Sequence, residues 1–235
     1  MKASSLIFYC LLLPMLFSGY ASGQGSFKLG TKTVVIPAPT DFVDAYSRIP
    51  AVKAYFDTTS EKDWTTLAVH IPSSLAPRIE RGEVIGSLGY YTNVGLPNSM
   101  TTEVITPQMF VDFVSQTEKS IGSEFDPKGR TVASAVASMR SIVKQATRQP
   151  IDIGIQQPLF LGHFTKQTDI YSIIALMTLR VGDRTIPMVG SRSWIVVNER
   201  LLYVNVYKEM VDDGDVSVVV DFTKKWTASI VAANK

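Results

Sequence analysis

The sequence predicts an α+β protein in which helices cover an antiparallel sheet. Apolar residues recur at helical spacing through the middle of the chain, the spacing changes to two after Pro150, and helical spacing returns near the C-terminus. Because the predicted strands are grouped and do not alternate with helices, the order excludes a parallel βαβ sheet. A chain of 235 residues with 46% hydrophobic residues has enough apolar side chains for a buried core.

The first part of the chain is expected to hold three short strands and one helix. Strands are expected at 33–37, 64–71 and 84–92, and prolines end the first two. Pro50 suits the first turn of a helix that runs through Val52, Tyr55 and Phe56. The third strand carries Tyr90 and Tyr91 and leads into a loop of Gly, Asn and Pro residues that reaches position 98.

Two helices are expected in the middle of the chain. Thr106 is a typical N-cap before Pro107, and apolar residues share one face as far as Ile121, before Gly122 ends the helix. A second helix begins near Pro127 and buries a stripe of side chains formed by Val132, Val136, Met139, Val143 and Ala146.

A meander of four strands follows at 151–164, 170–181, 185–197 and from 201 to near Tyr207. Gly154 and Gly162 are candidate positions for a bulge or bend in the first of these strands. The dipeptide Asn198-Glu199 lies between two apolar runs, which predicts a tight hairpin turn.

The last helix is indicated by apolar residues that share one face, Val219, Phe222, Trp226 and Ile230. Asp215 precedes this pattern and is expected to cap the helix. We expect the apolar face to cover the meander strands that carry Trp194, Val196 and Tyr203, because such a face needs an apolar surface.

Residues 1–23 have the pattern of a secretory signal peptide. Lys2 supplies the positive end, an apolar run follows at 6–17, and small residues follow that run. The run is shorter than the roughly 20 residues that cross a bilayer. The sequence therefore predicts cleavage, a periplasmic or secreted protein with no stable membrane span after cleavage, and a single domain at 24–235 without cysteine.

The order of early strands, central helices, meander and C-terminal helix extends over residues 30–232. In this order the chain resembles the bacterial secreted relatives of the Mog1/PsbP-like α/β/α sandwich. The resemblance rests on element order and no specific motif, so it carries over no functional residue. It implies a binding or assembly factor and not an enzyme.

Composition excludes several classes of function. The formal net charge of +2 does not provide the basic stripe of a nucleic-acid-binding protein. Two histidines, His70 and His163, without a cysteine in the predicted mature chain are too few ligands for a zinc site, so no metal is expected. No phosphate loop or dinucleotide motif is present, and no cofactor is expected.

Two kinds of functional residue remain as candidates. His163 could act as a base for a serine, with Asp169 as its orienting acid, but residues six apart on a strand lie roughly 20 Å from each other unless the chain bends. Tyr90 and Tyr91 are candidate binding residues, because tyrosine offers a large contact area at low entropy cost. The alternative is that strand alternation sends one of these tyrosines into the core.

These observations lead to one function and a second candidate. The expected function is a secreted or periplasmic, non-catalytic binding or assembly accessory protein, whose partner is an unknown envelope protein or a small ligand. The second candidate is an envelope-directed hydrolase that uses His163 and a serine.

Overall fold

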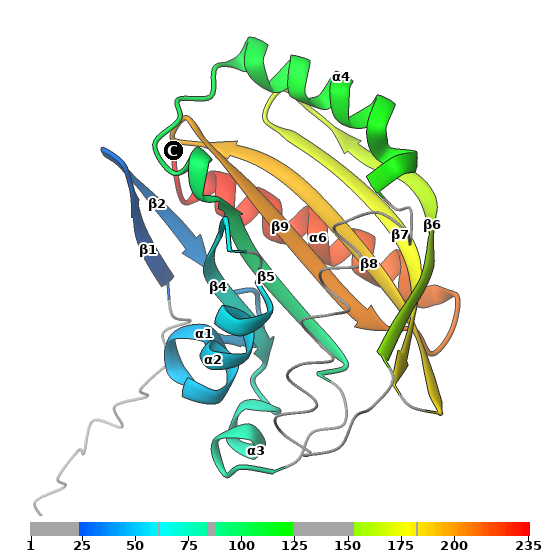
Figure 1. Ribbon diagram of the computed structural model, residues 1–235. Helices are drawn as coiled ribbons and strands as arrows, with labels where there is room; N and C mark the ends of the chain where they lie inside the picture. Colours follow the sequence, from blue (N-terminus) through cyan, green and yellow to red (C-terminus); the bar gives the residue numbers. More distant parts are fainter. Residues whose placement is uncertain (1–23, 61, 84–87, 125–152, 182) are drawn as a thin grey trace, which may run out of the picture.

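The computed structural model describes residues 24–60, 62–83, 88–124, 153–181 and 183–235 (Figure 1). The predicted signal peptide at 1–23 and the predicted second central helix, which begins near Pro127, lie outside the described residues.

The predicted α+β class is confirmed. In the described residues, seven strands form one antiparallel sheet in the order β3-β4-β5-β9-β8-β7-β6. The strands are β3 (Phe42–Asp44), β4 (Trp64–Pro72), β5 (Tyr90–Pro97), β6 (Ile153–Lys166), β7 (Ile170–Val181), β8 (Arg184–Val197) and β9 (Arg200–Glu209). The predicted meander is the run β6 to β9, and β9 also pairs with β5.

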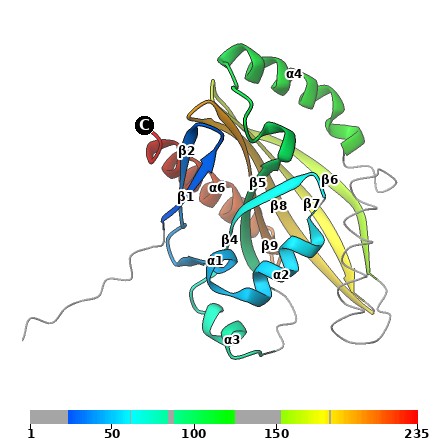
Figure 2. The ribbon, with the colours of Figure 1, turned by 60° about the vertical axis from the view of Figure 1, so that its left-hand side comes forward.

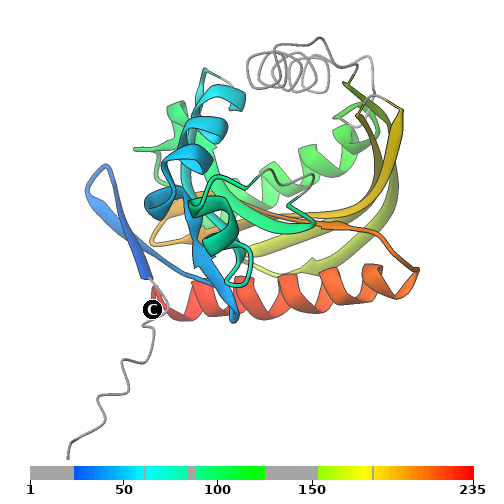
Figure 3. The same cartoon turned by 90° about the horizontal axis from the view of Figure 1, so that it is seen from below.

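Helices lie on both faces of this sheet. They are α1 (Ala45–Arg48), α2 (Pro50–Thr59), α3 (Ala76–Glu80), the 3-10 helix η1 (Asn98–Met100), α4 (Pro107–Glu124) and α6 (Gly214–Ala232). Figure 3 shows α6 running along the convex face of the curved sheet, whereas α2 and α4 lie on its concave side.

A separate hairpin stands beside the sheet. Strand β1 (Gln24–Leu29) pairs with β2 (Lys32–Pro37), and Figure 2 shows the hairpin near the C-terminal end of α6. Strand β2 was predicted, whereas β1 was not. It offers only two large apolar side chains, Phe27 and Leu29, among small and polar residues.

Local signals near proline and glycine are mostly confirmed. Helix α2 begins at Pro50, and the Thr106 hydroxyl accepts a hydrogen bond of 3.2 Å from the Met109 N–H at the start of α4. The expected stop at Gly122 is wrong, because α4 continues to Glu124. A single glycine costs a helix only about 1 kcal/mol relative to alanine.

The turns and bends of the meander follow the sequence closely. Asn198 and Glu199 adopt φ values of 48° and 62°, as a two-residue hairpin turn requires. The register of β6 against β7 shifts at Gly162, whose φ is 138°. Gly162 therefore lies at one of the three register shifts between these strands, while Gly154 pairs regularly with Arg180.

The third predicted strand is displaced along the chain. The segment from Tyr90 to Pro97, which the sequence assigned mostly to a loop, is the strand β5 between β4 and β9, and residues 84–87 lie outside the described part. Polar Asn93 and small Gly95 are typical of a loop. In the sheet, however, Asn205 of β9 donates a hydrogen bond to the Asn93 amide, and the Trp64 ring of β4 covers Gly95.

The predicted cap of the last helix is wrong. Helix α6 begins at Gly214, so Asp215 lies in its first turn. The Asp215 carboxylate accepts hydrogen bonds from the N–H groups of Val211, at 2.7 Å, and Asp212, at 3.3 Å, and it pairs with Lys208. Asp215 therefore fixes the turn that precedes α6.

The predicted partners of α6 lie on the other face of the sheet. Helix α6 packs on Ile195, Leu202 and Val204, whereas Trp194 and Tyr203 pack with α4. Val196 also lies on the α4 side. Successive residues of a strand point to opposite faces, and here both faces are apolar because each is covered by a helix.

No helix in the described part of the chain is long and apolar enough to cross a membrane.

Candidate binding site on the concave face of the sheet

A row of three polar side chains crosses the middle of the sheet. Arg192 of β8, Asn205 of β9 and Asn93 of β5 lie directly opposite one another in the strand register. Arg192 Nε donates a hydrogen bond of 2.9 Å to Asn205 Oδ1, and Asn205 Nδ2 donates one of 2.7 Å to Asn93 Oδ1. We call these three residues the polar row.

The polar row lies on the concave face. Asn205 alternates along β9 with Val204 and Val206, which pack under α6. It shares the opposite face with Tyr203, which packs with α4.

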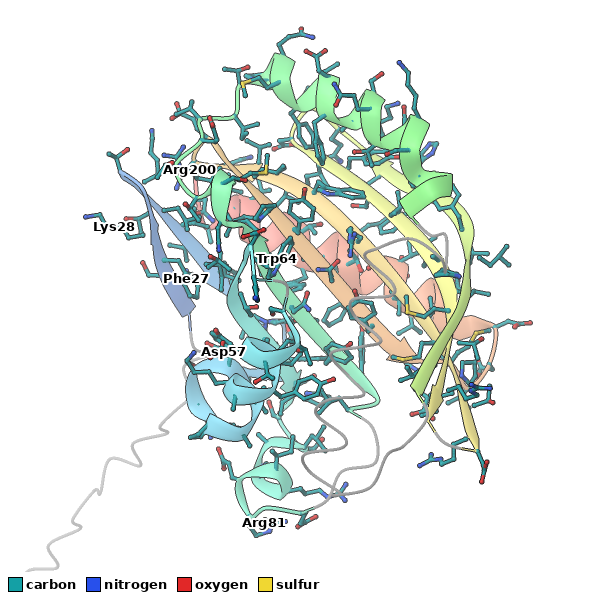
Figure 4. The ribbon with its side chains drawn as sticks, viewed as in Figure 1. Phe27, Lys28, Asp57, Trp64, Arg81 and Arg200 are labelled. Atoms are coloured by element: carbon teal, nitrogen blue, oxygen red, sulfur yellow. The ribbon has the colours of Figure 1, made fainter. Side chains whose placement is uncertain are left out.

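Aromatic side chains border the polar row on one side. Trp194 and Tyr203 each lie two residues from a member of the row, with ring centroids 5.9 Å apart. Trp64, labelled in Figure 4, extends this wall with its centroid 5.1 Å from that of Tyr203. The Trp64 ring lies over Gly95, where an added Cβ would overlap it.

Two stacked tyrosines border the row on its other side. The rings of Tyr91 and Tyr207 are 5.0 Å apart with an interplanar angle of 27°. Gly190 makes room for this pair, because a Cβ there would lie 3.1 Å from the Tyr207 ring and 2.7 Å from Met177 Cε. Burial raises the pKa of the Tyr91 phenol well above its usual value, so this group is neutral at physiological pH.

In the described part of the chain, no neighbouring acid balances the charge of the polar row. Arg192 is half-buried, and its guanidinium lies 6.0 Å from the Trp194 ring centroid. Among the described residues, no carboxylate is within ion-pair distance of Arg192, and only its Nε donates a hydrogen bond. Since arginine stays protonated in proteins, the concave face carries one positive charge here.

The two candidate tyrosines lie on opposite faces of β5. Tyr90 packs between Phe42 and Phe222 on the α6 side, at centroid distances of 5.2 and 5.0 Å. Its hydroxyl is buried without a hydrogen-bond partner in the described part of the chain. Only Tyr91 lies beside the polar row, so alternation separates the pair.

The structure does not bring His163 to a serine and an acid. His163 is exposed on β6, and its ring is 6.3 Å from that of Tyr171. Asp169 lies in the loop after β6, where its backbone carbonyl accepts a hydrogen bond from Val196 N–H. Within the described ranges, neither side chain forms a hydrogen bond with a serine hydroxyl or with the other.

The other histidine is part of the core. His70 is 1% exposed, with Nδ1 3.1 Å from Thr92 Oγ1 and its ring against that of Trp226. Burial lowers the pKa of His70 to about 4, and the Asp44 charge opposes this shift. No group of three or more metal-ligating side chains occurs among the residues that the structure describes.

A depression of about 1270 Å³ lies elsewhere, between β1, α1 and the start of β3. Both basic side chains that line it are already paired, since Arg48 bonds Glu80 and Lys53 bonds Asp57. The Asp44 carboxylate, also in the lining, accepts hydrogen bonds from the N–H groups of Tyr46 and Ser47. The polar row, which lacks such pairing, is the stronger candidate.

The sequence contained a signal for the polar row that the sequence analysis missed. Asn205 interrupts a run of apolar residues between Val204 and Val206, and Arg192 is a charged residue in the middle of β8, between Ser191 and Ser193. Polar side chains in the middle of buried strands need a partner, and such positions are candidate sites.

Comparison of the chain with protein families, with curated proteins and with solved structures finds no match. The resemblance of its element order to the Mog1/PsbP-like sandwich stays a prediction.

Proposed function

We propose that this protein is an exported, non-catalytic binding protein that holds a small ligand on the concave face of its sheet. The observation that carries the proposal is the polar row, in which a half-buried guanidinium bonds the Asn205 amide, this amide bonds that of Asn93, and aromatic rings flank all three. Ligand sites combine an apolar or aromatic lining with a few polar groups that orient the ligand.

The cost of desolvating Arg192 supports a binding role. This half-buried cation has no acidic partner among the residues that the structure describes, and it loses hydration that its hydrogen bond to Asn205 only partly replaces. A ligand that accepts hydrogen bonds from the guanidinium would offset this cost. A residue needed only for the fold could be apolar at this position, as Ile173 is directly opposite it on β7.

Export is the part of the proposal that rests on residues 1–23. Mass spectrometry of the protein from a secreting host should find a chain that begins at or near Ser22 or Gln24. An intact Met1 would contradict a periplasmic or secreted location.

Native mass spectrometry of the exported protein tests the binding function. Wild type should carry a small molecule from the host that Arg192→Ala loses and the control Arg184→Ala keeps, because Arg184 is exposed at the start of the same strand. Wild type and Arg192→Ala carrying the same molecules, or neither carrying any, would overturn the proposal. In the latter case an envelope protein becomes the better candidate partner.

A further inference from the structure

We infer that the ligand of the concave face is a carboxylic acid with a flat ring and a second hydrogen-bond acceptor at the end opposite its carboxylate. This inference rests on the proposed function and names the class of ligand. It follows from the direction of the hydrogen bonds in the polar row and from the two aromatic borders.

The arginine fixes the orientation of both amides. Arg192 Nε can only donate, so the atom of Asn205 that faces it is the oxygen. The amide nitrogen of Asn205 then faces Asn93 and donates to its oxygen. Asn93 is therefore left with its NH₂ group directed away from Asn205.

The groups that remain for a ligand are thus donors. Both amide oxygens of the row already accept a hydrogen bond, whereas Arg192 Nη1, Arg192 Nη2 and Asn93 Nδ2 donate none within the described part of the chain. The buried Trp194 N–H also lacks an acceptor there. A surface with a surplus of donors and one positive charge selects an anionic ligand that is rich in acceptors.

The geometry of the guanidinium favours a carboxylate. With Nε bonded to Asn205, the outer edge of the guanidinium presents its two terminal nitrogens side by side. This edge matches the two oxygens of a planar carboxylate in a bidentate pair.

The aromatic borders define the body of the ligand. Trp194 and Tyr203 lie on one side of the row, and Tyr91 and Tyr207 on the other. Each border is two residues from the row, or about 7 Å along the strands. A flat ring that lies along the row would contact both borders through its edges or faces.

The length of the row defines the position of the second acceptor. Arg192 and Asn93 are separated by one strand, so their backbones are about 10 Å apart at the usual strand spacing. A hydroxyl or carbonyl oxygen at the end of the ring opposite the carboxylate would meet Asn93 Nδ2.

Calorimetric titration with three probes tests the ligand class. The probes are 4-hydroxycinnamate, its uncharged amide, and adipate, which has carboxylates but no ring. Wild type should bind 4-hydroxycinnamate about 10- to 100-fold more tightly than the amide, as expected for hydrogen bonds to a charged group. It should also bind this probe more tightly than adipate.

Two matched variants test whether the preference for the acid over its amide depends on the polar row. Arg192→Gln should abolish the difference between acid and amide, and Arg184→Gln should preserve it. Circular dichroism and the melting temperature of Arg192→Gln should match those of wild type, so that the loss of affinity is not a loss of fold.

The outcomes separate this inference from the proposed function. If acid and amide bind wild type equally and Arg192→Gln weakens both, the ligand class is wrong and the binding site stands. Failure of wild type to bind 4-hydroxycinnamate also overturns the ligand class, and the molecules carried by the exported protein then decide the proposed function independently.

Discussion

Arg200 joins separate segments of the chain through their backbone carbonyl groups. The side chain is 2% exposed, and it donates from Nε to Leu29 O and from Nη1 to Glu103 O and Glu199 O. Figure 4 shows Arg200 at the end of the molecule where the β8–β9 turn and the β1–β2 hairpin approach each other. A single residue thus links the hairpin, the loop before α4 and the sheet.

Replacement of Arg200 by methionine should lower the free energy of unfolding. The buried carbonyl of Leu29 and the part-buried carbonyl of Glu103 would lose their donor, and an unsatisfied buried group costs about 1–3 kcal/mol, so we expect a loss of about 2–4 kcal/mol. Urea denaturation of Arg200→Met against the exposed control Arg184→Met measures this effect. Equal midpoints would show that the buried charge costs as much as its hydrogen bonds contribute.

The carboxylate of Asp215 makes the stability of the protein dependent on pH in the acid range. Its hydrogen bond with Lys208, followed by that from the Val211 N–H, lowers the pKa of Asp215 from 3.8 to about 2. A group with a lowered pKa in the folded state stabilises the fold above its unfolded pKa, and this contribution is lost as the pH falls toward the folded value.

Asp215→Asn should therefore be less stable than wild type at pH 7. The difference in stability between the variant and wild type should shrink as the pH falls from about 4 to about 2, because the Asp215 carboxylate of wild type becomes protonated over this range. Melting temperatures measured across this range provide the test. The neighbouring Asp213→Asn serves as control, since no described residue bonds the Asp213 side chain. A difference from wild type that stays constant down to pH 2 would exclude the ion pair as its cause.

At the scale of elements, α6 is anchored by one indole. Trp226 is 2% exposed, donates to Pro37 O at 2.9 Å and lies edge-on to His70 at 5.3 Å. Truncation to alanine should cost about 3–5 kcal/mol, as is usual for a buried tryptophan. Chemical denaturation of Trp226→Ala, compared with Val218→Ala on the exposed face of α6, provides the measurement. A loss below that of the control would mean that the helix is only loosely packed.

The long elements could be predicted from the sequence because their signals are local. The β6–β9 meander follows from alternation, and the Asn198-Glu199 turn follows from residues that tolerate positive φ. The short β3 and α3 offer too few residues for a period to be visible, and β1 has too few apolar side chains. The packing of Trp194 against α4 could not be predicted, because alternation shows which residues share a face and not which helix covers that face.

The candidate site was predictable only in part for a similar reason. Tyr91 was a candidate because a tyrosine side chain offers a large contact area, and it borders the polar row. Asn93 and Asn205 are 112 positions apart in the chain, and their contact depends on the pairing of β5 with β9. Nothing local in the sequence specifies which strand lies beside β5.

At the scale of the whole molecule, the two faces of the sheet have different roles. Helix α6 covers the convex face with a continuous apolar core, whereas the concave face combines apolar clusters under α2 and α4 with the polar row between them (Figure 3). The convex face supports the fold, and the concave face presents the candidate site.

Removal of α6 should therefore destroy the fold as a whole. A chain that ends at Asp215 would uncover Ile195, Leu202 and Val204 and release the hairpin from Trp226. We expect an insoluble or protease-sensitive product, because an exposed apolar face of this extent promotes aggregation.

Asn234→Ala tests the same connection in a chain that keeps the helix. Asn234 accepts a hydrogen bond from Val35 N–H at 2.8 Å and donates one to Val35 O at 2.7 Å, so the residues that follow α6 hold β2 in addition to Trp226. This variant should fold, with faster proteolysis and hydrogen exchange confined to the β1–β2 hairpin. If the truncated chain melts at the wild-type temperature, α6 does not join the hairpin to the sheet. If Asn234→Ala leaves hairpin exchange unchanged, the bonds of Asn234 to Val35 do not contribute to that connection.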